Sequence, residues 1–134
     1  MIMILEVENK SSVQVKSFSQ VEKKLRSLKS YGPSSYAIMT NQTGEYLQVA
    51  GGRVTCVVEH GIPKNEILKR AYLTNPKVSF RGPQTLVFGG GELQMEPDEI
   101  LFIDDVIELF SSFYHSKPLD IQVKWRDMSK VLNE

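Results

Sequence analysis

The sequence predicts an α+β fold, in which a mainly antiparallel sheet carries two amphipathic helices. Short segments rich in β-branched and aromatic residues follow one another with turn residues between them, as in a sheet of sequential strands. Two longer segments instead repeat their apolar residues with helical spacing. Strands and helices do not alternate regularly, so we expect the helices to cover one face of the sheet. The 134 residues are typical of a single domain spanning 1–134.

The N-terminal part predicts two extended segments and a helix. ILEVE at 4–8 and SVQVK at 12–16 are typical of strands. In the following stretch, 17–33, one apolar face is made by residues at i, i+4 and i+7, namely Val21, Leu25 and Leu28. Ser19 and Glu22 are spaced as a capping box, in which each side chain accepts a hydrogen bond from a main-chain N–H of the first turn. We expect the helix to end at Gly32–Pro33.

The opposite face of this helix is basic, with Lys23, Lys24, Arg26 and Lys29. A basic helix can contact nucleic acid, but a solvated outer face explains the same pattern, and the net charge of the chain is zero. We therefore expect no nucleic-acid partner.

A three-stranded meander is predicted next, with strands at 35–40, 45–50 and 53–60. In the second strand Leu47 and Val49 face one side and Tyr46 the other. Gly51–Gly52 is expected to form a two-residue hairpin turn, since both central positions of a type I′ turn need positive φ.

The middle of the chain gives weaker strand signals. We expect Gly61 and Pro63 to end the meander, and five short strands to follow at Tyr72–Leu73, Val78–Phe80, 85–88, 92–95 and 99–103.

A second helix is predicted over 104–117, ending before Pro118. Asp105 and Glu108 are spaced as a capping pair, and acids suit the positive end of the helix dipole. Its core stripe is Val106, Leu109, Phe110, Phe113 and Tyr114. A last half-buried strand is expected over 119–127, with its inward residues at Ile121, Val123 and Trp125.

The residues give little support for metal or nucleophilic chemistry. Cys56 stands among β-branched residues and is expected to be buried, while His60 and His115 stand beside turn signals. One cysteine and two separated histidines do not fill a four-ligand zinc site. We expect no metal, cofactor or catalytic residue. The apolar start is too short for a signal peptide or membrane span, so we expect a cytosolic protein with no membrane partner.

The segment 88–108 holds seven acidic residues and no basic one. Asp104, Asp105 and Glu108 are explained by the second helix. The remaining four are Glu92, Glu96, Asp98 and Glu99. The preceding triple glycine lacks the lysine and hydroxyl of a phosphate loop and is expected to be a turn. These four carboxylates are either solvating acids or a docking surface for a basic partner, and an acid–base pair among them stays open.

Three stretches resemble the first-described immunity protein family of bacterial polymorphic toxin systems. SYAIMTNQTGEYLQVAGGRVTCVVEH is similar to its central meander, EILFIDDVIELFSSFYHSKP to its second helix, and LDIQVKW to its closing strand. Together they cover about half of the chain.

The resemblance implies a cytosolic inhibitor that binds a cognate toxin domain and blocks its active site. The toxin would be a nucleic-acid deaminase or nuclease, whose basic cleft an acidic patch can occupy. We expect Glu92, Glu96, Asp98 and Glu99 to bind it, with Tyr46 as an aromatic anchor unless Tyr46 packs under the first helix. The alternative is a small-molecule-binding or enzymatic domain with an acidic pocket. The oligomeric state is left open.

Overall fold

A computed structural model describes residues 2–79 and 81–130 and confirms the α+β class. Seven strands form one antiparallel sheet in the order β2-β1-β3-β4-β5-β6-β9. Their bounds are β1 Ile4–Val7, β2 Val13–Gln14, β3 Tyr36–Thr40, β4 Tyr46–Gly52, β5 Thr55–Ile62, β6 Ile67–Tyr72 and β9 Lys124–Asp127. A separate hairpin is formed by β7 (Gln84–Phe88) and β8 (Gly91–Met95). The helices are α1 (Phe18–Arg26) and α2 (Ile103–Tyr114), and the 3-10 turns are η1 (Pro63–Asn65) and η2 (Pro97–Glu99).

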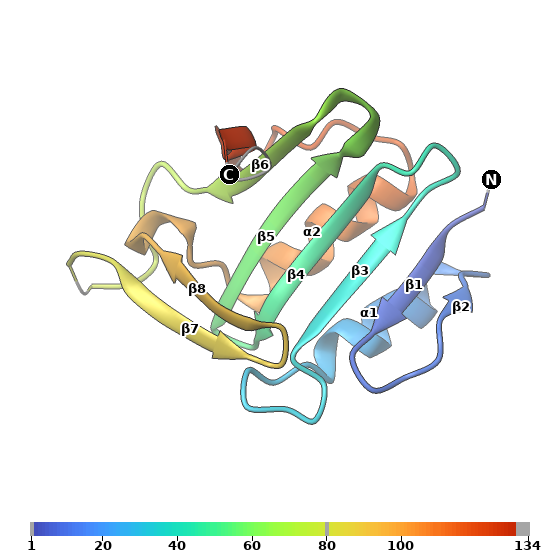
Figure 1. Cartoon of the computed structure of the whole chain (residues 1–134), viewed down its shortest axis with the longest axis horizontal. Coiled ribbons are helices and arrows are strands. Elements are labelled where there is room, and N and C mark those ends of the chain that lie inside the picture. Colours follow the sequence, from blue (N-terminus) through green and yellow to red (C-terminus); the bar gives the residue numbers. More distant parts are fainter. Residues whose placement is uncertain (1, 80, 131–134) are drawn as a thin grey trace.

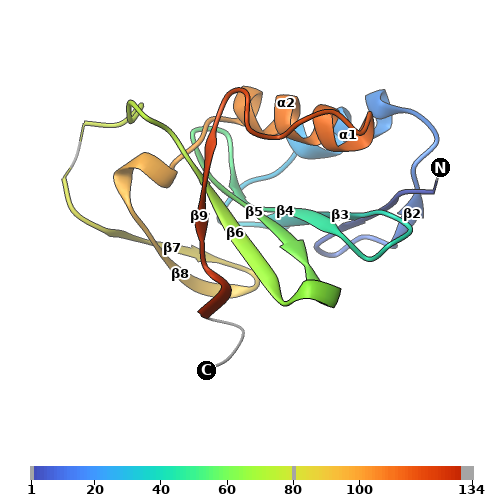
Figure 2. The same ribbon diagram turned by 90° about the horizontal axis from the view of Figure 1, so that it is seen from above.

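The molecule has three layers, with both helices on one face of the sheet and the β7–β8 hairpin on the other (Figures 1 and 2). The main core lies between the sheet and the helices and includes Leu5, Leu25, Leu47, Val58 and Phe110. A smaller core lies beneath the hairpin and consists of Ala50, Val57, Leu86, Met95 and Ile100. None of the helices in the described part of the chain has the length and apolarity needed to cross a bilayer.

The predicted apolar face is buried, because Val21 and Leu25 on α1 and Leu28 just after it are all fully inaccessible to solvent. The predicted capping box is wrong: the N-cap is Ser17 rather than Ser19, so the helix begins two residues earlier, and the Ser17 side chain makes no capping hydrogen bond. It also ends at Arg26, well before Gly32–Pro33.

The meander is confirmed, but its second hairpin turn lies two residues later than predicted. Gly51 and Gly52 belong to β4, and Arg53–Val54 form the connection to β5. Glycine is needed at Gly52 because a side chain there would overlap the main chain of Leu28. The meander then continues through Gly61 into β6, so Gly61 does not end it.

The weaker strand predictions were partly wrong. Strand β6 ends at Tyr72 rather than spanning Tyr72–Leu73, and Val78 and Ser79 are not in a strand, whereas Phe80 lies outside the described residues. The predicted strand at 99–103 is replaced by the end of η2 and a single bridge between Leu101 and Cys56. Strands β7 and β8 confirm the other two segments, and Gly89–Gly90 form the turn between them.

Helix α2 buries its predicted stripe, although Tyr114 stays partly exposed. Asp105, rather than an Asp105–Glu108 pair, satisfies its N-terminus by accepting a hydrogen bond from the Phe102 N–H at 2.9 Å. The last strand begins only at Lys124, and Ile121, predicted to face inward, is 76% exposed.

Candidate functional site

The structure places the four predicted docking acids in different environments. Glu99 is buried, with 2% of its surface exposed. Its Oε1 accepts hydrogen bonds from Arg70 at 3.2 Å and from the main-chain N–H of Glu96 at 2.8 Å, and its Oε2 accepts one from Arg126 at 2.6 Å. The expectation that Glu99 lies free on a docking surface is therefore wrong, because its carboxylate balances two arginines inside the protein.

Asp98 belongs to the same ion cluster. Its carboxylate pairs with Arg126 at 3.0 Å, and Arg70 also pairs with Glu59 at 2.9 Å. The hydrogen bonds that Arg126 donates to Asp98 and, to a smaller extent, to Glu99 hold the pKa of Arg126 above its usual value. The Arg126 guanidinium also lies 4.5 Å from the ring centre of Tyr72. Asp98 therefore has a structural role, which its position in the sequence did not indicate.

This ion cluster fixes the base of the hairpin to the sheet. Arg70 Nη1 donates to the main-chain oxygen of Gln94 in β8 at 2.7 Å. The N–H of Leu73, just after β6, donates to the main-chain oxygen of Asp98 at 2.8 Å. The hairpin base is therefore held by both side-chain and main-chain bonds.

The tip of the hairpin is fixed as well. The Gly89 N–H donates to the Ser35 hydroxyl oxygen at 2.7 Å, and the Ser35 hydroxyl and N–H both donate to Glu8 Oε1 at 2.6 and 2.8 Å. A side chain at Gly89 would overlap the Glu8 carboxylate, so glycine allows this close approach. With both ends tied down, the hairpin presents its outer face as a fixed platform.

Strand alternation determines which side chains form that outer face. Leu86 points toward the small core, whereas Val87 points away and is 61% exposed. Glu92 lies directly opposite Val87 in the register, and Thr85 lies opposite Gln94, so these four exposed side chains share one face. None of the ion pairs found among the described residues involves Glu92.

A groove of about 510 Å³ separates this face from the loop between α1 and β3. Tyr31, which is 80% exposed, and Val87 both line it. We call Tyr31, Thr85, Val87, Glu92 and Gln94 together the hairpin surface. The sequence analysis did not identify Tyr31 or Val87 as functional residues. Two signals could have indicated their exposure: Tyr31 is an aromatic residue beside the Gly32–Pro33 turn, and Val87 occupies an outward, alternate position of β7.

Glu96 lies away from the hairpin surface. It is exposed just after β8, about 13 Å along the strand from Glu92. There it lines a separate depression with Pro76, Pro97, Asp98 and Arg126. The predicted acids therefore do not form one continuous patch.

Tyr46 lies on the face of the sheet opposite the helices, which rules out packing under α1. Its ring covers Gly61, its partner in the β4–β5 register, and a side chain at Gly61 would overlap it. Burial, and then the negative charge of Glu59, raise the pKa of the Tyr46 hydroxyl. Tyr46 is thus half-buried, and strand alternation places it on the face of the sheet opposite the helices.

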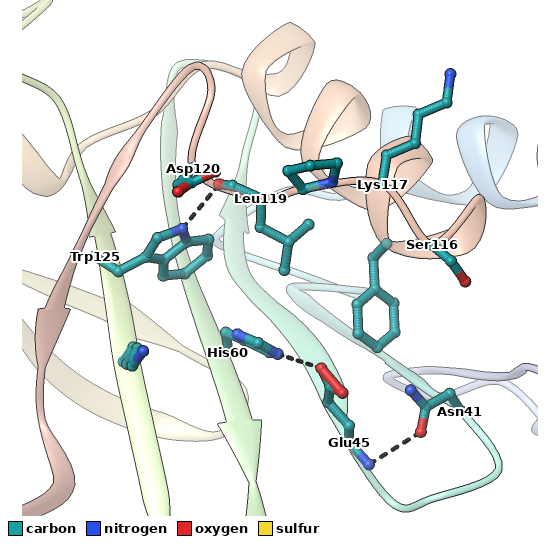
Figure 3. A pocket seen from close by; sticks show the side chains of 11 residues that line it. Asn41, Glu45, His60, Ser116, Lys117, Leu119, Asp120 and Trp125 are labelled. Atoms are coloured by element: carbon teal, nitrogen blue, oxygen red, sulfur yellow. Dashed lines mark hydrogen bonds and ion pairs between the residues drawn. The ribbon is translucent and has the colours of Figure 1, made fainter.

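A second cavity, of about 480 Å³, opens between the sheet and the loop after α2. His60 Nε2 and Glu45 Oε2 lie 2.8 Å apart across it, and Trp125 donates to the main-chain oxygen of Leu119 at 2.8 Å (Figure 3). The His60 ring packs edge-on to Phe113 and Trp125. None of the four predicted docking acids lines this cavity.

Cys56 is buried on β5, as predicted, and burial raises the pKa of its thiol to about 12. The thiolate fraction near neutral pH is therefore very small. Within residues 2–79 and 81–130, no cluster of three or more His, Cys, Asp or Glu side chains is arranged to hold a metal ion.

Neither the protein-family models nor the curated proteins compared with this chain match it.

Proposed function

We propose that this chain is an immunity-type protein of the bacterial cytosol, which binds a cognate toxin domain and blocks its active site without catalysis of its own. The observation that carries the proposal is the hairpin surface. Tyr31 and Val87 are exposed on the two sides of one groove, although each has a large apolar area. Exposed aromatic and apolar side chains beside a groove are typical of protein-binding sites.

The anchoring of the hairpin supports binding of a protein partner. Because the ion cluster holds its base and the Ser35–Glu8 contacts hold its tip, little conformational entropy is lost when a partner docks. A preformed platform of this kind binds more tightly than a mobile loop with the same side chains.

The charge of the hairpin surface favours a basic partner. Glu92 is exposed and its carboxylate faces solvent beside Val87. An enzyme that acts on nucleic acid carries a basic cleft for phosphates, and an exposed carboxylate next to apolar anchors complements such a cleft. The toxin we propose is therefore a nucleic-acid deaminase or nuclease.

The proposal is tested with the toxin domain encoded by the neighbouring reading frame. We expect titration calorimetry to give a one-to-one complex, and Tyr31→Ala and Val87→Ser each to weaken it about tenfold or more. Ile121→Ser is the matched control, since Ile121 is 76% exposed but lies outside the hairpin surface. An absence of binding at micromolar concentrations would show that the proposal is wrong.

The His60 cavity supports a second candidate, the binding of a small molecule. Its aromatic walls and the His60–Glu45 pair are typical of a ligand pocket, although it is not the acidic pocket expected from the sequence. Trp125 is the single tryptophan, so its fluorescence reports on this cavity. A metabolite that changes the emission of the wild type, but not that of His60→Ala, would favour this candidate.

A further inference from the structure

We infer that the outer edge of β7 pairs with an extended segment of the partner, which adds a third strand to the hairpin. The inference rests on the proposed function, because the partner is the basic toxin domain. It specifies how that domain is recognised: by main-chain hydrogen bonds along β7 and by a lysine or arginine that reaches Glu92. This is strand addition to an exposed sheet edge.

The register shows which main-chain groups of β7 are available. Only two residues, Gly89 and Gly90, separate the paired residues Phe88 and Gly91, so this closing pair exchanges both of its hydrogen bonds across the hairpin. Hydrogen-bonded pairs alternate along an antiparallel ladder, so the next one is Leu86 with Leu93.

The N–H and C=O groups of Thr85 and Val87 therefore point away from β8. Among the described residues, no hydrogen bond outside the strand ladders uses them, and β7 pairs with no strand other than β8. On β8 the equivalent outward carbonyl, that of Gln94, is already bound by Arg70. The free edge of the hairpin is thus the β7 edge, which faces away from the sheet in Figure 1.

Strand β7 also lacks the features that usually protect an edge. Its sequence is QTLVF, with no charge and no proline, and Thr85 and Val87 are exposed β-branched residues. The two edges of the main sheet differ: β2 has only two residues, and β9 carries Lys124, Arg126 and Asp127. Short strands and charged side chains discourage pairing, so β7 stands out as the edge open to another strand.

The chemistry around β7 specifies the incoming segment. A residue opposite Val87 would share a face with Val87 and Glu92, at about 10 Å from Glu92, which is two strand spacings. A lysine or arginine side chain spans that distance. Beyond the C-terminal end of β7, the groove lined by Tyr31 and Phe88 can receive an apolar side chain of the same segment.

A second copy of this chain fits the edge less well. Self-pairing would place the uncharged β7 of the other copy beside Val87, and the Glu92 carboxylate would gain no counter-charge. A basic segment supplies that charge, so we assign the edge to the toxin domain rather than to a homodimer.

Amide hydrogen exchange, followed by NMR on the unmodified protein with and without the toxin domain, tests this inference. We expect the amides of Thr85 and Val87 to exchange rapidly in the free protein and at least tenfold more slowly in the complex. The Leu86 amide, already bonded across the hairpin, is the internal control and should be protected in both.

The outcomes separate the two proposals. If the complex forms but the exchange of Thr85 and Val87 is unchanged, strand addition is wrong while toxin binding stands. If these amides become protected in the free protein as its concentration rises, the occupant is a second copy and the inference is again wrong. If no complex forms, the proposed function itself fails, and this inference with it.

A backbone variant sharpens the test. Val87→Pro removes an outward N–H together with the valine side chain, and the β7–β8 ladder keeps its bonds because this N–H points away from β8. Val87→Thr keeps the N–H and the β-branched shape. We expect Val87→Pro to weaken binding about tenfold or more and Val87→Thr to weaken it by less than threefold. Equal losses in the two variants, at unchanged melting temperature, would show that the side chain rather than the strand edge is recognised.

Discussion

The two ends of the acidic segment differ in what their carboxylates do. At the hairpin end, Glu92 faces solvent beside an exposed valine and pairs with no cation among the described residues. At the η2 end, Asp98 and Glu99 neutralise Arg70 and Arg126 and tie the hairpin to the sheet. Neighbouring acids of one segment therefore serve different purposes: those at the base hold the platform in place, and Glu92 lies on its exposed face.

This difference predicts a graded series of effects on stability. Removing one member of a buried ion pair leaves its partner charged and unsolvated, whereas removing an exposed carboxylate costs little. The following substitutions test the comparison, beginning with the largest effect.

Glu99→Ala should have the largest effect, because it leaves the buried side chain of Arg70 with one counter-ion fewer and removes the bond to the Glu96 N–H. We expect the free energy of unfolding to fall by about 3–5 kcal/mol. Urea denaturation measures it, with Glu92→Ala as the control that should change it by less than about 0.5 kcal/mol. Similar losses in both variants would remove the distinction between the two ends.

Leu86→Ala should destabilise the small core beneath the hairpin. Leu86 is 4% exposed there, and we expect a loss of about 2 kcal/mol, at the low end for such a substitution because the hairpin can settle toward the sheet. Hydrogen exchange should show faster opening of β7 and β8 with little change in α1 and α2. Uniform acceleration throughout the protein would indicate one cooperative unit instead.

Asp98→Ala should have the smallest effect of the three, about 1 kcal/mol. Its side chain is 27% exposed, so solvent screens its bond to Arg126, which also retains Glu99. Chemical denaturation of this variant and of Glu99→Ala under the same conditions gives the ranking. A larger loss of stability for Asp98→Ala than for Glu99→Ala would show that the ion cluster depends more on Asp98 than on Glu99.

Local patterns allowed much of the fold to be predicted. Val21, Leu25 and Leu28 repeat with helical spacing and are all buried, and the meander strands alternate as the sheet requires. The turn predicted at Gly51–Gly52 was wrong because these glycines are required for close packing against Leu28 and the neighbouring strand, not for the turn itself. That requirement comes from the tertiary structure and leaves no mark in the local pattern.

The candidate site was harder to predict for the same reason. Glu99 is paired with Arg70 and Arg126, which are 29 and 27 residues away in the chain, so no local pattern indicated its burial. Exposure of Tyr31 and Val87 likewise depends on how the hairpin lies across the sheet. Only Glu92 among the predicted acids lies on the hairpin surface, and its role in docking stays a prediction.

The rate of association with the neighbouring toxin domain, measured at several salt concentrations, tests the central claim most directly. If Glu92 is the carboxylate that meets a basic partner, Glu92→Lys should slow association several-fold and flatten its dependence on salt, while the melting temperature stays unchanged. Wild-type and Glu92→Lys rates that coincide at every salt concentration would contradict the claim that the hairpin end of the acidic segment is the docking end.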